Sequence, residues 1–296
     1  MGRPIDCKKF SDDLLSLIAK SIQTKQAHPI LSVLTIGEVS AASQAYIRNK
    51  QKACERVGII YQHIAFSSTE NVSTIINIIK QLNDNPQVGG IIVQLPIQHE
   101  VLNANPDGVK VITSQIDPSK DVDGFSFNAG GFLYEGFKKH PYRLYPCTAC
   151  GVYRLLLGAF DGLEGLKGKN VTIVGRSDLV GKPLALMLQD ADCTVTVCHS
   201  KTKNLNDHLK NADILISATG VPGLLENLPT TYEAIIDVGI TRGEDGKLHG
   251  DISEEIKRKH SEMYTSVPGG IGLVTVTMLI SNVWLAYQEN NFAENN

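Results

Sequence analysis

Apolar and polar positions alternate along the chain with two different periods. Apolar runs bounded by turn residues predict buried strands at 30–37 and 88–96, and residues 59–66 are predicted as the strand between them. Between these runs, apolar residues recur at helical spacing, which predicts amphipathic helices at 7–22, 43–58 and 67–83. We expect Ser43 to cap the second helix, Gly58 to end it, and a capping box from Ser67 to Glu70 to begin the third. Strands alternating with helices are typical of an α/β fold with a parallel sheet.

The alternation of predicted strands and helices is interrupted over residues 105–146 and then resumes. That stretch is rich in Gly, Pro, Asp and Asn, and because long idle connections are uncommon we expect a functional loop region there. A helix is predicted at 147–160. Further strands are predicted at 169–175, 193–199, 213–220 and 234–240, and further helices at 179–190, 205–212 and within 267–289. We therefore place a domain boundary near residue 147 and expect the terminal helix to pack back on the first domain.

The strand at 169–175 leads into a glycine turn, VTIVGRSDLVGKP. Gly175 permits a sharp turn, and Gly181 lets a helix begin close to the sheet, where its free N–H groups favour phosphate. The spacing departs from the usual dinucleotide fingerprint. Five residues between the glycines, and Pro183 in place of a hydroxyl residue, also exclude the usual ATP loop. By itself the turn leaves a dinucleotide site and an ordinary strand–helix connection equally open.

The end of the next strand favours one cofactor. Folds that bind NAD place an acidic residue there for the ribose hydroxyls, whereas a basic residue accommodates the extra phosphate of NADP. Here the strand ends in His199, followed by Ser200 and Lys201, with no carboxylate. Arg176 in the glycine turn adds a guanidinium suited to phosphate. The sequence therefore predicts NADP rather than NAD.

Composition narrows the classes of function. The 296-residue chain has a formal net charge of −3, so no basic surface for nucleic acid is predicted. No apolar run approaches the length of a membrane span, and the N-terminus lacks a signal-peptide core, so we expect a cytoplasmic protein without a membrane partner. The six cysteines suit reduced thiols better than a disulfide framework. Cys147 and Cys150 form a C-x-x-C pair, but no second ligand pair lies near them, so no metal site is predicted.

Seven stretches share one further property, their resemblance to a single enzyme family. In chain order they are YIRNK, GIIVQLPI, KDVDGF, PCTACG, VGRSDLVGKP, CHSKT and VPGGIGLVTVTML. Together they resemble the methylenetetrahydrofolate dehydrogenase/methenyltetrahydrofolate cyclohydrolase family of FolD-like enzymes. The resemblance implies an α/β catalytic domain at 1–146, completed by the C-terminal helix at 274–296. It also implies a Rossmann-type NADP-binding domain at 147–273, a cleft between the two domains, and a homodimer.

The resemblance implies the reaction and the site residues. The family oxidises 5,10-methylenetetrahydrofolate with NADP and hydrolyses the methenyl product to 10-formyltetrahydrofolate, within one-carbon metabolism and purine biosynthesis. Lys50 matches the family's catalytic lysine and Tyr46 its folate-stacking tyrosine. Gln94 matches the glutamine beside the lysine, and Asp123 the pterin-binding aspartate. The small-molecule folate site would also include Leu95, Pro268, Gly269 and Gly270. The cofactor contacts would be Gly175, Arg176, Ser177, Gly181, His199, Ser200, Thr219, Gly220 and Ile240.

The residue types suit this chemistry. Tyr46 and Lys50 are four apart, so they lie on one face of the predicted helix. Hydrolysis needs a group that takes a proton from water and returns one to a ring nitrogen, and a lysine alternating between ammonium and amine could do both. Three alternatives stay open: another NADP-dependent two-domain dehydrogenase of the shikimate or amino-acid type, a monofunctional methylenetetrahydrofolate dehydrogenase, and a non-catalytic dinucleotide-binding regulator.

Overall fold

The chain forms two compact units in a computed structural model that describes residues 1–105, 107–125, 127–140 and 143–292. Unit 1 comprises Met1–Asp12, Phe132–Pro141 and Thr148–Thr275, and unit 2 comprises Asp13–Gly131, Tyr142–Cys147 and Val276–Asn296. The division falls within helices α1 (Cys7–Thr24), α6 (Phe127–Glu135), α7 (Cys147–Ala159) and α12 (Ile271–Phe292). Each unit contains its own parallel sheet.

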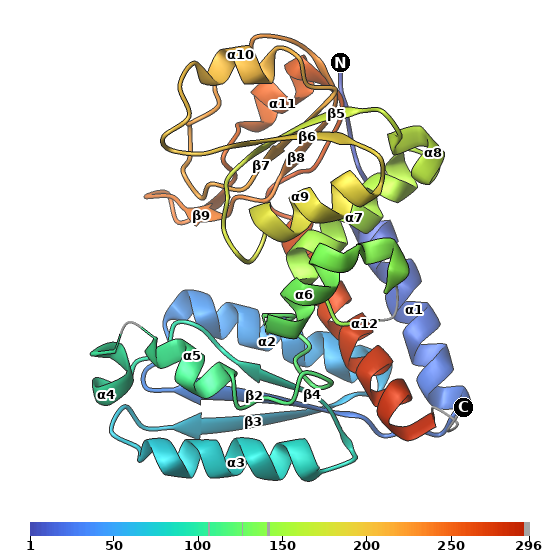
Figure 1. The fold of residues 1–296 in the computed structure, drawn as a ribbon. Coiled ribbons are helices and arrows are strands. Elements are labelled where there is room, and N and C mark those ends of the chain that lie inside the picture. The colour runs from blue at the N-terminus through green and yellow to red at the C-terminus, as the bar shows by residue number, and fades with distance from the viewer. Residues whose placement is uncertain (106, 126, 141–142, 293–296) are drawn as a thin grey trace. The chain divides into compact units, whose positions relative to one another are not determined.

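Unit 2 is built on a three-stranded parallel sheet in the order β3–β2–β4. Its strands are β2 (Ile30–Ile36), β3 (Ile60–Phe66) and β4 (Val88–Val93), and its helices include α2 (Ala41–Val57), α3 (Val72–Asp84), α4 (Glu100–Asn103) and α5 (Gly108–Thr113). Because β3 and β4 lie on opposite sides of β2, right-handed crossovers place α2 and α3 on opposite faces of the sheet (Figure 1). Strands β2 and β4 are therefore buried on both faces, which explains their continuous apolar runs.

Unit 1 contains a six-stranded sheet in the order β1–β11–β8–β7–β5–β6, in which every pair is parallel. Its strands are β1 (Arg3–Pro4), β5 (Asn170–Val174), β6 (Thr194–Cys198), β7 (Ile214–Ser217), β8 (Tyr232–Asp237) and β11 (Ser261–Tyr264), with a small hairpin of β9 (Thr241–Arg242) and β10 (Leu248–His249). Its helices include α8 (Leu163–Leu166), α9 (Gly181–Asp190), α10 (Leu205–Leu209) and α11 (Glu254–His260). Figure 1 shows α10 and α11 on one face of this sheet and α9 on the other.

Two predicted helix starts are wrong by several residues. Ser40 is the N-cap of α2, because its Oγ accepts a hydrogen bond from the Ser43 backbone N–H at 3.2 Å. Ser43 therefore lies inside the first turn. Asn71, whose Oδ1 accepts from the Ser73 N–H at 2.9 Å, caps α3 in place of the expected Ser67–Glu70 box. The predicted end of α2 is confirmed, since Gly58 adopts a left-handed φ of 84°.

The region expected to be loop-rich contains more helix than its composition indicates. Helices α5 and α6 and a 3₁₀ turn at Phe137–Lys139 lie in its described part. Two short strands of unit 1, β1 and β11, have no clear sequence signal. They form through pairing with other parts of the chain, since β11 pairs in parallel with β8 and Arg3–Pro4 pairs in parallel with Met263–Tyr264.

Helix α12 corrects the expectation that no segment approaches a membrane span. By length and composition its 22 residues are sufficient to cross a membrane. However, 61% of its most apolar window is buried within the protein, as in the core helix of a globular domain. Within unit 2, Asn282 Nδ2 donates to the carbonyl oxygens of Val122 at 2.8 Å and Tyr145 at 3.0 Å. From Val276 onward the chain belongs to unit 2, the unit that contains the N-terminal sheet.

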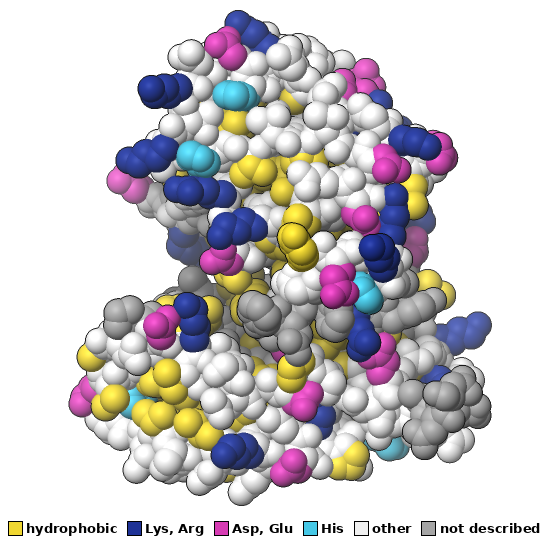
Figure 2. Space-filling model, in the orientation of Figure 1, with side chains coloured by type: hydrophobic (Ala, Val, Ile, Leu, Met, Phe, Trp, Pro, Cys, Tyr) yellow, Lys and Arg dark blue, Asp and Glu magenta, His cyan; other side chains and the backbone are white. Residues whose placement is uncertain are grey.

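Charges of both signs are interspersed on the surface. Figure 2 shows Lys and Arg side chains mixed with Asp and Glu over the face that it draws. Exposed ion pairs are local, such as Lys110 with Asp107 at 2.9 Å and Lys210 with Asp207 at 3.4 Å. Exposed pairs of this kind contribute little to stability, so the fold depends on its two apolar cores.

Candidate active site

Lys50 and Gln94 meet at the carboxyl end of the unit 2 sheet. Lys50 projects from α2, Gln94 directly follows β4, and Lys50 Nζ donates to Gln94 Oε1 over 2.9 Å. Gln94 is held in place, since its backbone N–H donates to Leu34 O at 2.8 Å and its Nε2 donates to Leu95 O at 2.9 Å. The β2–α2–β3 and β3–α3–β4 crossovers run across the sheet in opposite directions, so the sheet has a topological switch point between β2 and β4. Open α/β sheets bind their ligands at such points.

Tyr46 lies one helical turn before Lys50 on the same face of α2. Its side chain is 41% exposed, while Lys50 is half-buried. An exposed aromatic ring beside a lysine gives a flat ligand a surface for stacking.

The KDVDGF loop is anchored by a buried lysine to which the sequence patterns assigned no role. Lys120 is 5% exposed, and its Nζ donates to the carbonyl oxygens of Leu82 (3.2 Å), Asn83 (2.6 Å) and Asn85 (2.7 Å) at the end of α3. A lysine there satisfies the last carbonyls of the helix and complements its dipole. Burial lowers the pKa of Lys120, and nearby acidic groups oppose that shift. The motif thus encodes an anchor as well as the aspartate.

Two other contacts hold the same loop. Lys120 O accepts from the Ile91 N–H at 2.9 Å, which extends the sheet beside β4. Gly124 has a φ of 72°, and a Cβ at this position would overlap the backbone of Tyr145. Together with the Asn282 contacts, these interactions hold the residues on both sides of Asp123.

Asp123 is partly buried within this loop. Burial raises the pKa of its carboxyl group, and the nearby Lys50 charge lowers it. Lys50 therefore acts on Gln94 through a hydrogen bond and on Asp123 through its charge. The structure brings these three predicted residues into one region of unit 2.

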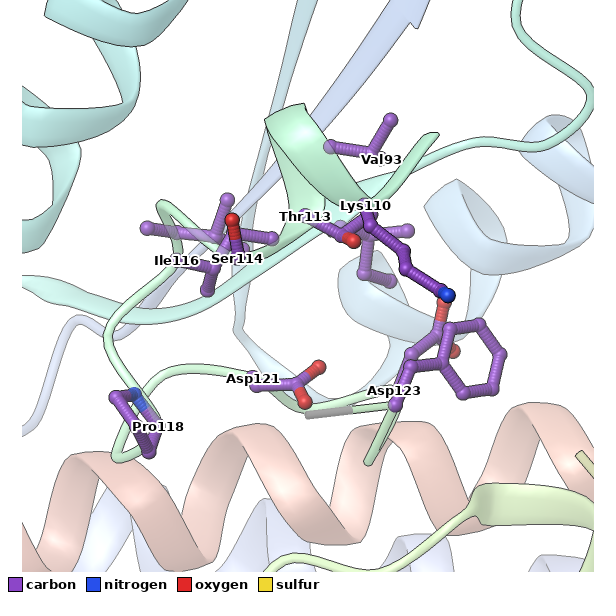
Figure 3. A pocket seen from close by; sticks show the side chains of 11 residues that line it. Val93, Lys110, Thr113, Ser114, Ile116, Pro118, Asp121 and Asp123 are labelled. Carbon is purple, nitrogen blue, oxygen red and sulfur yellow. The ribbon is translucent and has the colours of Figure 1, made fainter. Parts of the chain in front are cut away.

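Asp123 also lines a cavity of about 530 Å³, a size suited to a small organic ligand. Figure 3 shows Lys110, Thr113 and Ser114 at one side of it, from α5 and its C-cap. Asp121 and Asp123 lie at the other side. The walls between them are mainly apolar, with Ile91, Ile92, Val93, Ile116, Pro118 and Phe125. An apolar cavity with a few carboxylates suits a flat heterocycle that carries N–H donors.

In unit 1 the predicted glycine turn brings backbone segments so close together that there is no room for a side chain at either glycine. Gly175 follows β5 with a φ of 132°, and a Cβ on it would overlap the Ala218 carbonyl. A Cβ on Gly181, the first residue of α9, would overlap the Gly175 carbonyl. At the start of α9 the Val180 N–H donates to Ser177 Oγ at 3.2 Å and the Lys182 N–H donates to the Ser177 carbonyl oxygen at 3.1 Å, so hydrogen bonds to Ser177 hold the turn. Arg176 and Ser177 are exposed in the same turn, so the residues present fit a dinucleotide.

The remaining predicted cofactor residues follow strands that end at the same edge of the sheet. His199 and Ser200 follow β6, Thr219 and Gly220 follow β7, and Ile240 follows β8. The loop after β6 turns back on itself, since the His199 N–H donates to Thr202 Oγ1 at 2.9 Å and the Lys201 N–H to His199 Nδ1 at 3.1 Å. Strand β5 lies between β6 and β7, so this sheet also has a switch point.

Three residues predicted for the folate site belong to the other unit. Pro268, Gly269 and Gly270 follow β11 in unit 1, after a cis Val267–Pro268 peptide, whereas Tyr46, Lys50, Gln94, Leu95 and Asp123 belong to unit 2. The Val267 N–H donates to Glu254 Oε1 at 3.1 Å, which attaches this segment to α11.

The chain is similar over most of its length to a known group of enzymes. Residues 5–123 match the tetrahydrofolate dehydrogenase/cyclohydrolase catalytic domain, and residues 146–291 match the NAD(P)-binding domain of the same family. A bifunctional protein FolD of Staphylococcus epidermidis is 39% identical over 259 residues, which is 87% of this chain and 86% of the relative.

Solved structures agree with these matches. The bifunctional FolD dehydrogenase/cyclohydrolase of Campylobacter jejuni is 34% identical with a TM-score of 0.87, covering 98% of this chain and 99% of that one. The FolD of Trypanosoma brucei, solved with NADP cofactor and inhibitor, is 29% identical with a TM-score of 0.85, covering 99% of both chains.

Fold and site together define a two-domain α/β enzyme that works with a dinucleotide. The chain belongs to the tetrahydrofolate dehydrogenase/cyclohydrolase family. This result confirms the predicted family and fold class, the paired oxidoreductase and hydrolase activities of folate one-carbon metabolism, and the NADP-type dinucleotide cofactor.

Proposed function

We propose that Lys50 is the acid/base group of the hydrolytic step, that Gln94 orients it, that Tyr46 stacks on the folate, and that Asp123 binds the pterin. The observation that carries this proposal is the 2.9 Å hydrogen bond from Lys50 Nζ to Gln94 Oε1, made at a switch point and beside an exposed tyrosine. Leu95 and the Pro268–Gly270 segment complete the proposed folate contacts.

The oxidation step demands positioning more than acid–base catalysis. Removing hydride from a methylene between two nitrogens leaves a resonance-stabilised cation, so no strong base is needed. NADP⁺, when bound, accepts that hydride. The protein then has to hold the folate in one orientation, and Tyr46 and Asp123 supply a stacking face and an ionic acceptor for the pterin N–H groups.

Hydrolysis of the methenyl product demands proton transfer. Water adds to the cationic carbon and loses a proton, and a ring nitrogen must gain one before the ring opens. Lys50 in its amine form takes the first proton and in its ammonium form returns it. Gln94 accepts a hydrogen bond from Lys50 without adding charge, so it can fix the position of Nζ in both forms.

The variant Lys50→Met tests this assignment. We expect cyclohydrolase kcat to fall by about 10²–10⁴-fold, because general acid–base catalysis contributes on that scale, while the dehydrogenase keeps most of its rate. Lys52→Met, an exposed lysine on the same helix, is the matched control and should keep both activities. Both are measured by the absorbance of the methenyl product. Full cyclohydrolase activity in Lys50→Met would contradict the proposal.

We further propose NADP in preference to NAD, with Gly175, Arg176, Ser177, Gly181, His199, Ser200, Thr219, Gly220 and Ile240 as cofactor contacts. The loop after β6 carries His199, Ser200 and Lys201 and no carboxylate, which suits a 2′-phosphate. Assays with methylenetetrahydrofolate and either NADP⁺ or NAD⁺ separate this proposal from the alternatives. A monofunctional dehydrogenase would not hydrolyse the methenyl product, and a shikimate-type enzyme or a regulator would form none.

The biological setting proposed is a cytoplasmic homodimer whose 10-formyltetrahydrofolate product supports purine biosynthesis. The functional division proposed is residues 1–146 with 274–296 for the folate and 147–273 for the cofactor. The compact units differ from that division at Met1–Asp12, where β1 pairs with β11, and at Phe132–Pro141, since both segments belong to unit 1.

A further inference from the structure

A buried carboxylate in unit 1 contacts the loop that follows β7. Asp251, between β10 and α11, is fully buried. Its Oδ2 accepts from Ser217 Oγ at 2.7 Å and from the Thr219 N–H at 2.8 Å. Its backbone carbonyl accepts from the Gly223 N–H at 3.1 Å. Asp251 therefore contacts the last residue of β7 and two positions in the first part of the loop that follows it.

The same carboxylate also touches the loop that follows β8. A Cβ on Gly239 would overlap Asp251 Oδ1, so that loop passes directly over the carboxylate. Among the described residues Oδ1 has no hydrogen-bond partner. The loop and Asp251 are joined further through Asp237, whose Oδ1 accepts from the Gly239 N–H at 3.2 Å and the Asp251 N–H at 3.0 Å. Lys257 Nζ, at 3.3 Å from Asp237 Oδ2, supplies a buried positive charge.

The strand order shows which half of a dinucleotide these loops would meet. Strand β6 lies on one side of β5, whereas β7 and β8 lie on the other. In such folds the diphosphate sits at the turn after the first strand and the adenosine ribose at the end of the second. The nicotinamide half must then lie over the ends of β7 and β8, where Thr219, Gly220 and Ile240 are found.

We infer that Asp251 is a positioning residue for the nicotinamide half of the cofactor site. It acts through the Thr219 backbone and the Gly239–Ile240 segment, and it contacts neither substrate nor cofactor. This inference rests on the proposed dinucleotide function of unit 1. It predicts that losing the carboxylate weakens binding of the whole dinucleotide but leaves binding of its adenosine end unchanged.

The test compares two ligands by calorimetric titration of the full chain. NADP⁺ spans both halves of the site, whereas adenosine 2′,5′-bisphosphate needs only the adenosine end. Asp251→Ala removes the acceptor for Thr219 and Ser217, so we expect NADP⁺ to bind about tenfold or more weakly, with the bisphosphate Kd unchanged within about twofold. Asp251→Asn keeps one acceptor oxygen but places an NH₂ group against Gly239, so NADP⁺ should weaken by about two- to tenfold. Asp245→Asn, an exposed aspartate of the β9–β10 hairpin, is the control and should change neither Kd.

Each outcome decides the inference. Equal weakening of both ligands would mean a general loss of domain structure and would overturn it, as would an unchanged NADP⁺ affinity in Asp251→Ala. If Asp251→Ala does not fold, the Asn variant decides by the same comparison of ligands. If the unaltered protein does not bind NADP⁺, both the proposed cofactor function and this inference are overturned. If the unaltered protein binds NADP⁺ and the Asp251 variants bind it equally well, only this inference is overturned.

Discussion

Asp123 is subject to two opposing effects. Burial raises the pKa of its carboxyl group, and the positive charge of Lys50 lowers it. The proposed pterin contact needs the ionised form, because a carboxylate accepts an N–H hydrogen bond at each of its two oxygens, whereas the protonated group presents an O–H donor at one of them. Lys50 therefore has a second effect besides proton transfer, since it helps Asp123 stay ionised as the pH falls.

Removing that charge should move the acidic limit of folate binding. In Lys50→Met the pKa of Asp123 rises further, so binding of a non-reactive folate analogue should begin to weaken at a higher pH than in the unaltered protein. Below that pKa, binding should weaken by about tenfold per pH unit. Fluorescence titrations over an acidic pH series measure the shift, with Lys52→Met as control. A shift toward lower pH would show that Lys50 does not act on Asp123 in this way.

Among the secondary-structure elements, the β5–α9 connection is the most tightly constrained by its glycines. The Gly175 carbonyl occupies the space that a side chain at Gly181 would need. By contrast, Gly158 is an exposed position in α7, and a Cβ there would meet nothing within 4 Å. The two glycines therefore have opposite tolerance for alanine.

Gly181→Ala should destabilise unit 1 by about 1–3 kcal/mol through overpacking and should weaken NADP⁺ binding, because the amino end of α9 has to move. Gly158→Ala should stabilise the protein by about 0.5–1 kcal/mol, since alanine loses less conformational entropy in a helix. Thermal unfolding and NADP⁺ titration of both variants measure the contrast. Unchanged NADP⁺ affinity in Gly181→Ala would remove the glycine turn from the cofactor site.

At the scale of the whole molecule, the burial of the cysteine side chains determines how readily their thiols react. All six are buried thiols that form no disulfide, including the C-x-x-C pair in α7. Burial raises the pKa of Cys7 to about 11 and that of Cys54 to about 12. Thiols react as thiolates, so burial and a raised pKa together make these side chains unreactive in the folded state.

We expect the native protein to react slowly with a disulfide reagent such as DTNB near neutral pH, and six thiols to titrate after denaturation. The reagent's absorbance change measures both stages. The contrary result, a thiol that reacts within seconds in the native protein, would mean that one of these side chains is accessible and ionised.

The sequence by itself determined the alternation of strands and helices, the two-domain α/β class, the glycine turn and the family. These features depend on local spacing and on short motifs, which a single chain carries without reference to its neighbours. Even the local signal for a helix start gave the wrong residue where two possible N-cap serines lie close together, since Ser40 rather than Ser43 caps α2.

Only the tertiary structure decided which distant groups meet. Lys50 on α2 meets Gln94 at the end of β4, and Asn282 holds the aspartate loop from a helix more than a hundred residues further along the chain. Lys120 and Asp251 stood in the sequence as an ordinary lysine and aspartate. They became an anchor and a positioning residue only when strand order placed backbone groups around them, because such hydrogen bonds depend on packing in three dimensions and leave no periodic signal in the sequence.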